Sequence, residues 1–163
     1  MQMRNNMKAV YLEVNKVFLN DCTTNHHLLT IVNQNLDKYN NYRGVATLWQ
    51  PLNFLLTGEF MSQNLMGKAI LGEILNTSED FPVWGVLKYP ELVNQVKLLR
   101  SVNQELFFYN GWEDDLKANY IFPQRWYSTD KYLKHEMRNA LNGLIRFYRN
   151  VIQNENGILI CIQ

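Results

Sequence analysis

The C-terminal end of the chain carries the pattern that most restricts its fold. Residues Ile158–Ile162 are uniformly apolar and follow the turn-forming pair Asn156-Gly157. A short run without polar alternation is typical of a strand that is buried on both faces. We therefore expect this segment to lie within a small sheet that helices cover.

A second strand is predicted near the N-terminus, where the apolar residues of Val10–Val14 alternate with Tyr11 and Glu13. This alternation is typical of a half-buried strand. A single strand cannot satisfy its own backbone groups, so the two terminal strands should pair with each other or with a middle strand. The segment Phe81–Tyr89 is expected to be extended.

Two helices are predicted from apolar spacing and from their end signals. The last helix can be capped by Thr129 or Asp130, and its apolar residues recur every three or four positions. Another helix starts at Trp49, has Pro51 in its first turn and stops at Gly58. The apolar stripe of the last helix consists of Leu133, Met137, Leu141, Leu144, Ile145 and Tyr148.

Weaker signals predict the remaining elements. In the N-terminal half they predict a helix over His26–Lys38, capped by Asp21 or Thr24, and a turn at Asn40–Gly44. A broken helix or loop is expected at Asn64–Leu75 and a polar loop at Thr77–Asp80. Further along, a helix should open at Pro90 and continue through Leu106 and Phe107, and a turn of helix is expected at Asp114–Tyr120. The expected fold is α+β: a single domain over residues 1–163, with a small sheet that includes the N- and C-terminal strands and packs against several helices.

Composition limits the classes of function. The net charge of +1 provides no overall field for nucleic acid or an anionic membrane, and no run reaches the roughly 20 apolar residues of a membrane span. The polar segment Met1–Lys8 does not resemble a signal peptide, so a cytoplasmic location is expected. Cys22 and Cys161 lack metal-ligand spacing and are expected to be reduced thiols, at least one of them in the core.

Five blocks of residues, in order, resemble the YfbM-like proteins, a bacterial family of domains of unknown function. The blocks lie between residue 7 and the C-terminus and comprise Trp49–Gly58, Met66–Gly72, Leu87–Val93, Ile121–Trp126, and Leu144–Tyr148 with Ile158–Ile162. Asn53 stands where the family pattern usually has histidine, which removes a proton-transfer role at that position. The resemblance implies an immunity protein, because YfbM-like domains also occur among the immunity proteins of bacterial toxin–immunity loci.

No catalytic, metal or cofactor constellation is found in the sequence, so no enzyme activity is expected. His26 and His27 are adjacent and point about 100° apart on a helix, which prevents side-by-side chelation of one metal. One of the two is expected to face the solvent and the other to be half-buried. His135 lies among cationic residues and is interpreted as part of a solvated helix face. No nucleotide-binding glycine pattern or nucleophile elbow is present.

The predicted partner is a cognate protein toxin, for example a nuclease domain, whose active site the chain would cover without contacting nucleic acid. Trp112, Glu113, Asp114 and Asp115 form an acidic, aromatic-flanked segment that we predict binds this partner, together with Trp126. The same three carboxylates would also suit a helix N-terminus, and a divalent metal site is the third alternative.

Two other functions stay open at this point. A small-molecule-binding domain or an enzyme of unrecognised type would place its pocket between the Trp49 helix and Pro82–Tyr89. A housekeeping domain without any toxin partner is the other alternative.

Overall fold

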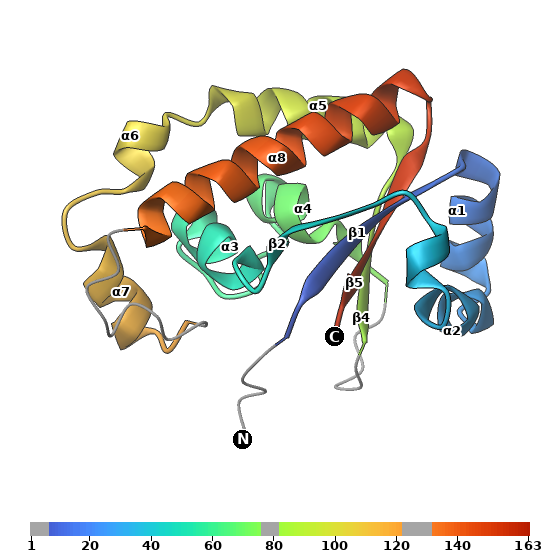
Figure 1. Ribbon diagram of the computed structural model, residues 1–163, viewed down its shortest axis with the longest axis horizontal. Helices are drawn as coiled ribbons and strands as arrows, with labels where there is room; N and C mark the ends of the chain where they lie inside the picture. Colours follow the sequence, from blue (N-terminus) through green and yellow to red (C-terminus); the bar gives the residue numbers. More distant parts are fainter. Residues whose placement is uncertain (1–6, 76–81, 122–131) are drawn as a thin grey trace.

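The sheet at the centre of the molecule has the strand order β2-β1-β5-β4-β3 and is antiparallel throughout (Figure 1). These features are taken from a computed structural model that describes residues 7–75, 82–121 and 132–163. The strands are β1 (Ala9–Val14), β2 (Asn41–Ala46), β3 (Glu73–Ile74), β4 (Val83–Leu87) and β5 (Gly157–Ile162).

The two terminal strands pair directly with each other. Ala9 lies opposite Ile162 and Val14 lies opposite Gly157, and β5 pairs with β4 on its other side. Every residue of β5 is buried. The predicted α+β fold, with both terminal strands in one small sheet packed against helices, is therefore confirmed.

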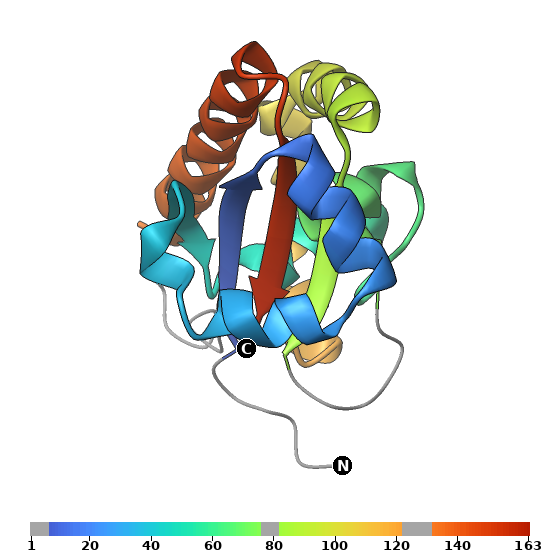
Figure 2. The ribbon, with the colours of Figure 1, turned by 90° about the vertical axis from the view of Figure 1, so that its right-hand side faces the viewer.

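Helices cover both faces of this sheet (Figure 2). On one face lie α1 (Lys16–Thr24), α2 (His27–Asn33) and the 3-10 turn η1 (Leu36–Lys38), which enclose a small core around Leu12, Leu159 and Cys161. The larger core, on the other face, is formed with the helices α3 (Trp49–Thr57), α4 (Leu65–Leu71), α5 (Tyr89–Ser101), α6 (Gln104–Phe107), α7 (Trp112–Ala118) and α8 (Leu133–Gln153).

Strong periodic patterns predict the structure well. In α3, Pro51 lies in the first turn and Gly58 adopts the left-handed conformation that ends the helix, with φ of 76°. The predicted stripe of α8 is buried along its whole length, and α5 begins beside Pro90. The capping residues proposed at Thr129 and Asp130, and the polar loop at Thr77–Asp80, lie outside the described residues.

The N-terminal third differs from the prediction. Strand β1 is buried on both faces rather than half-buried, because helices lie on both sides of it, and the Tyr11 side chain is fully enclosed. Helix α1 was not predicted, since only Leu19 and Cys22 of its residues are buried. The expected helix over His26–Lys38 divides into α2 and η1.

Two further segments also differ. Where a turn was expected at Asn40–Gly44, residues 41–44 belong to β2, which is an edge strand and therefore shows little apolar alternation. The helix from Pro90 stops at Ser101, and α6 begins separately at Gln104 with Asn103 as its cap.

Helix α4 sits directly on the sheet at a place where β4 has no side chain. A Cβ atom added to Gly85 would lie 1.8 Å from the backbone oxygen of Leu71, at the C-terminal end of α4. Two buried tyrosine hydroxyls reach the same helix end: Tyr11 donates to the oxygen of Ile70, and Tyr148 donates to that of Ala69, each at 2.8 Å. We call this arrangement the α4 seat.

Glu13 joins three chain segments at one end of the sheet. Partial burial raises the pKa of its carboxyl group, but Asn154, Asn156 and Asn40 donate hydrogen bonds to the carboxylate, and the pKa falls below its ordinary value. A carboxyl group with a lowered pKa stabilises the fold at pH values above its pKa in the unfolded chain, which is about 4.3. This contribution is lost as the pH falls through the lower pKa of the folded state.

Replacing Glu13 with glutamine is expected to reduce the free energy of unfolding at pH 7 by no more than about 1 kcal/mol, because solvent screens this partly exposed group. The difference from the wild type should shrink at acidic pH, as the pH falls through the lowered pKa of the folded state and the wild-type carboxylate also becomes protonated. Urea unfolding at neutral and at acidic pH measures the effect, with the exposed Glu73→Gln as the control. An equal loss at low and neutral pH would contradict the assignment.

Candidate functional site

The predicted partner-binding segment forms the start of α7, but its aromatic residue points inward. Trp112 is only 8% exposed and packs edge-on against Phe108, with ring centroids 5.2 Å apart. Its indole belongs to the larger core and exposes little area to a partner, and its role in partner binding stays a prediction. Trp126 lies outside the described residues.

The three carboxylates of this segment are exposed in the first turn of α7. Negative charges at this position interact favourably with the helix dipole. Asp114 lies 3.7 Å from the ammonium of Lys117. Asp115 accepts a hydrogen bond from the Tyr109 hydroxyl, which together with burial raises the pKa of Tyr109 to about 12. Their role in partner binding stays a prediction.

Exposed apolar and aromatic side chains accompany these carboxylates. Leu106 in α6 is 74% exposed, Tyr109 is 42% exposed, and Tyr120 after α7 is 61% exposed. These residues belong to α6, α7 and their connections, which form one end of the molecule (Figure 1). We call this region, consisting of Leu106, Tyr109, Glu113, Asp114, Asp115 and Tyr120, the α6–α7 end.

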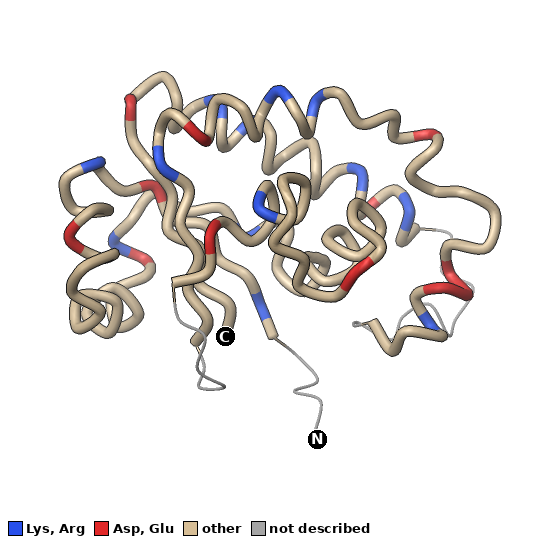
Figure 3. The backbone as a smooth tube through the Cα atoms, turned by 180° about the vertical axis from the view of Figure 1, so that it is seen from behind, with Lys and Arg blue, Asp and Glu red and all other residues tan. Residues whose placement is uncertain are grey.

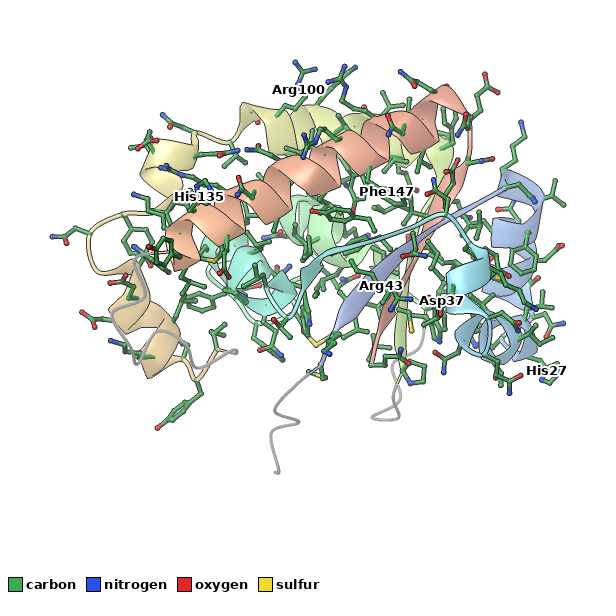
Figure 4. The ribbon with its side chains drawn as sticks, in the orientation of Figure 1. His27, Asp37, Arg43, Arg100, His135 and Phe147 are labelled. Carbon is green, nitrogen blue, oxygen red and sulfur yellow. The ribbon has the colours of Figure 1, made fainter. Side chains whose placement is uncertain are left out.

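The histidines do not form a site. His26 and His27 are both exposed, so the expectation that one of them is half-buried is wrong. His27 and His135 lie at opposite ends of the molecule (Figure 4). No group of three His, Cys, Asp or Glu residues within 7–75, 82–121 and 132–163 is placed to hold a metal ion.

Both cysteines are buried free thiols, as expected for reduced core residues. Burial is the main cause that raises the pKa of Cys22 to about 11 and that of Cys161 to about 12. A thiol with such a pKa is protonated at neutral pH and is a poor nucleophile or metal ligand. The Cys161 side chain lies 3.7 Å from the amide oxygen of Asn33, beneath α2.

Asn53 has a structural role in α3. Its side chain is fully buried, its amide oxygen accepts from the backbone N–H of Ser62 at 3.1 Å, and its amide nitrogen lies 3.4 Å from the oxygen of Gly67. These contacts hold the loop between α3 and α4. Helix α4 contacts α3 and lies against β4 at Gly85, in the region where the small-molecule alternative would place its pocket.

A groove lies instead between α5 and α8 and encloses about 440 Å³. Sequence reasoning missed it, because the cationic residues of α8 were interpreted as a solvated face. Figure 3 shows Lys and Arg positions along both helices. The groove is lined by Leu99, Arg100, Gln104, Asn139, Asn142, Ile145 and Arg146.

These features define an α+β domain with a sheet enclosed by helices, without a recognisable metal centre among its described residues. No helix in the described part of the chain is long and apolar enough to cross a membrane. A family model called "Domain of unknown function (DUF1877)" matches residues 7–161. The chain therefore belongs to this family, and its resemblance to YfbM-like proteins is confirmed.

A solved structure shows the same fold. It is the crystal structure of YfbM from Escherichia coli, described as a protein of unknown function. The two chains are 21% identical and superpose with a TM-score of 0.78 over 96% of this chain and 99% of that chain. A comparison with curated proteins finds no match.

Proposed function

We propose that this chain is an immunity protein that acts in the bacterial cytoplasm, binds a protein toxin domain and occludes the toxin's active site. The observation that carries the proposal is the α6–α7 end, where exposed Leu106, Tyr109 and Tyr120 accompany three exposed carboxylates. Aromatic and apolar side chains that stay exposed in the free protein are suited to bury area in a complex.

The charge of this region indicates what kind of partner it suits. Glu113, Asp114 and Asp115 follow one another in the first turn of α7, and among their neighbours only Lys117 forms a salt bridge with them in the described structure. The whole chain carries a net charge of +1 and does not attract a basic toxin surface as a whole. The attraction would come from the three carboxylates of this region alone. A nuclease domain, whose active site binds a polyanion, presents such a basic surface.

Occlusion needs no catalytic group in the inhibitor. A stable complex would bury about 1,600 Å² in total, with a few well-packed residues contributing most of the affinity. The buried Trp112 would support this surface from beneath, because its ring packs against Phe108. Tyr109 would be oriented by its hydrogen bond to Asp115.

The first experiment co-expresses the chain with the toxin domain encoded by the neighbouring gene. We expect growth to be restored and a complex to elute as one species in size-exclusion chromatography. If the toxin still stops growth and no complex forms, the immunity proposal is wrong for that pair.

A charge-reversal variant tests the binding surface. Glu113→Lys combined with Asp114→Lys should weaken toxin binding by at least about tenfold, mainly through a slower association rate. The matched control is Asp21→Lys with Glu73→Lys, which changes the net charge equally at exposed sites in α1 and β3. Surface plasmon resonance measures both pairs. Equal weakening by the two pairs would mean that net charge, rather than the α6–α7 end, controls binding.

A further inference from the structure

The groove between α5 and α8 combines a cationic rim with an apolar floor. Leu99 and Ile145 are buried, with 1% and 9% exposure, and form apolar lining. Arg100 on α5 and Arg146 on α8 are both exposed and line the same groove (Figure 4 labels Arg100). The two helices pack directly on each other, which brings together two arginines that are far apart in the sequence.

Neither of these arginines has a carboxylate partner within the described ranges. By contrast, Arg43 binds Asp37 at 2.6 Å and Arg138 binds Glu105 at 2.7 Å. No acidic residue lines the groove, so its lining carries two formal positive charges. Two guanidinium groups that line one groove without a counter-charge favour an anionic ligand.

Amide side chains supply further polar groups to the groove. Gln104 donates to the amide oxygen of Asn142 at 2.8 Å, so this oxygen is used within the protein. The amide nitrogen of Asn142 has no protein acceptor among the described residues and can donate to a ligand. The Asn139 side chain contacts His135 at 2.9 Å.

We propose that this groove binds a small phosphate-bearing organic molecule. Arg100 and Arg146 would bind the phosphate oxygens, Asn142 would donate a further hydrogen bond, and Leu99 and Ile145 would contact the organic part. The guanidinium fork suits the paired oxygens of a phosphate group. The volume of about 440 Å³ is that of a small-ligand pocket rather than of a single-ion site.

The test titrates the isolated protein with inorganic phosphate, AMP and adenosine at constant ionic strength, followed by ¹H–¹⁵N NMR spectra. We expect AMP to bind more tightly than inorganic phosphate, adenosine to bind least, and the shifted amide signals to come from residues 99–104 and 139–146. Shifts elsewhere, or no binding of either phosphate probe up to about 10 mM, would overturn the proposal. No toxin is used, so this outcome is independent of the proposed immunity function.

A matched pair of variants separates a site from a general positive field. Arg100→Gln with Arg146→Gln should weaken AMP binding by at least about tenfold, which corresponds to about 1.4 kcal/mol. Lys97→Gln with Arg149→Gln removes the same charge from the same two helices, about one turn away in each, and should weaken binding by less than about twofold. Circular dichroism confirms that both variants are folded. Equal weakening by both pairs would overturn the proposal.

Discussion

Gly85→Ala is expected to destabilise the protein by about 3 kcal/mol or more, because it removes the space in which α4 rests on the sheet. The added Cβ would lie 1.8 Å from the backbone oxygen of Leu71. A flexible side chain can rotate away from such a contact, but here the obstacle is the backbone at the end of α4. Either β4 or α4 would have to move, and both belong to the packed core.

Urea unfolding, followed by tryptophan fluorescence, measures this loss as a lower midpoint. Gly58→Ala provides the control, because a Cβ there meets nothing within 4 Å. Gly58 has φ of 76°, so the control carries only the backbone cost of the left-handed conformation, about 1–2 kcal/mol. If the two variants had equal unfolding midpoints, close packing of α4 at Gly85 would not be important for stability.

The second large effect is expected when the two buried tyrosine hydroxyls of the α4 seat are removed. Tyr11→Phe leaves the backbone oxygen of Ile70 without its donor, and Tyr148→Phe does the same to Ala69. Both tyrosine side chains are fully buried, so no solvent replaces the lost bond. Each single variant should cost about 1–3 kcal/mol.

The double variant should deviate from additivity, because the tyrosine rings lie 6.1 Å apart and their acceptors are adjacent residues. A double-mutant cycle from urea unfolding measures the coupling free energy. The control is Tyr109→Phe, whose hydroxyl binds Asp115 near the surface and whose loss should change stability by less than about 1 kcal/mol. Losses for the buried tyrosines no larger than this would contradict their role at α4.

Burial also determines how these hydroxyls behave with pH. Desolvation, with a smaller contribution from the neighbouring tyrosine in each case, raises the pKa of Tyr11 and Tyr148 above the ordinary value of about 10. Both hydroxyls therefore stay protonated and continue to donate at neutral pH. The cluster is a structural support rather than a source of acid–base chemistry.

The segments predicted correctly are those in which the residue pattern and its environment agree. Ile158–Ile162 is apolar at every position because helices lie on both faces of the sheet, and α8 is amphipathic because one side faces the core. Helix α1 and strand β2 were missed because they lie at the periphery and bury few side chains. Tyr11 was assigned to a polar face. A tyrosine whose hydroxyl donates to a buried backbone oxygen has no distinct pattern in the sequence around it.

The candidate sites were less predictable than the fold. The acidic segment at Glu113–Asp115 was identifiable because its residues are contiguous and exposed. The burial of Trp112 could not be predicted in the same way, because it depends on Phe108 and the rest of the core. For Asn53, the sequence predicted only the loss of a proton-transfer role, because its contacts with Ser62 and Gly67 depend on a loop whose path the sequence does not reveal.

Apolar patterning and helix-end signals predicted the two terminal strands, the last helix and α3 with its Gly58 stop, because these signals depend on residues close together in the sequence. The family followed separately, from the resemblance carried by five blocks of residues in order. Only tertiary packing decided three features. It placed α4 on Gly85, supported α4 by Tyr11 and Tyr148, and placed Arg100 and Arg146 in one groove. In each case the physical reason is that the interacting groups belong to different elements, whose relative positions depend on burial of the whole core.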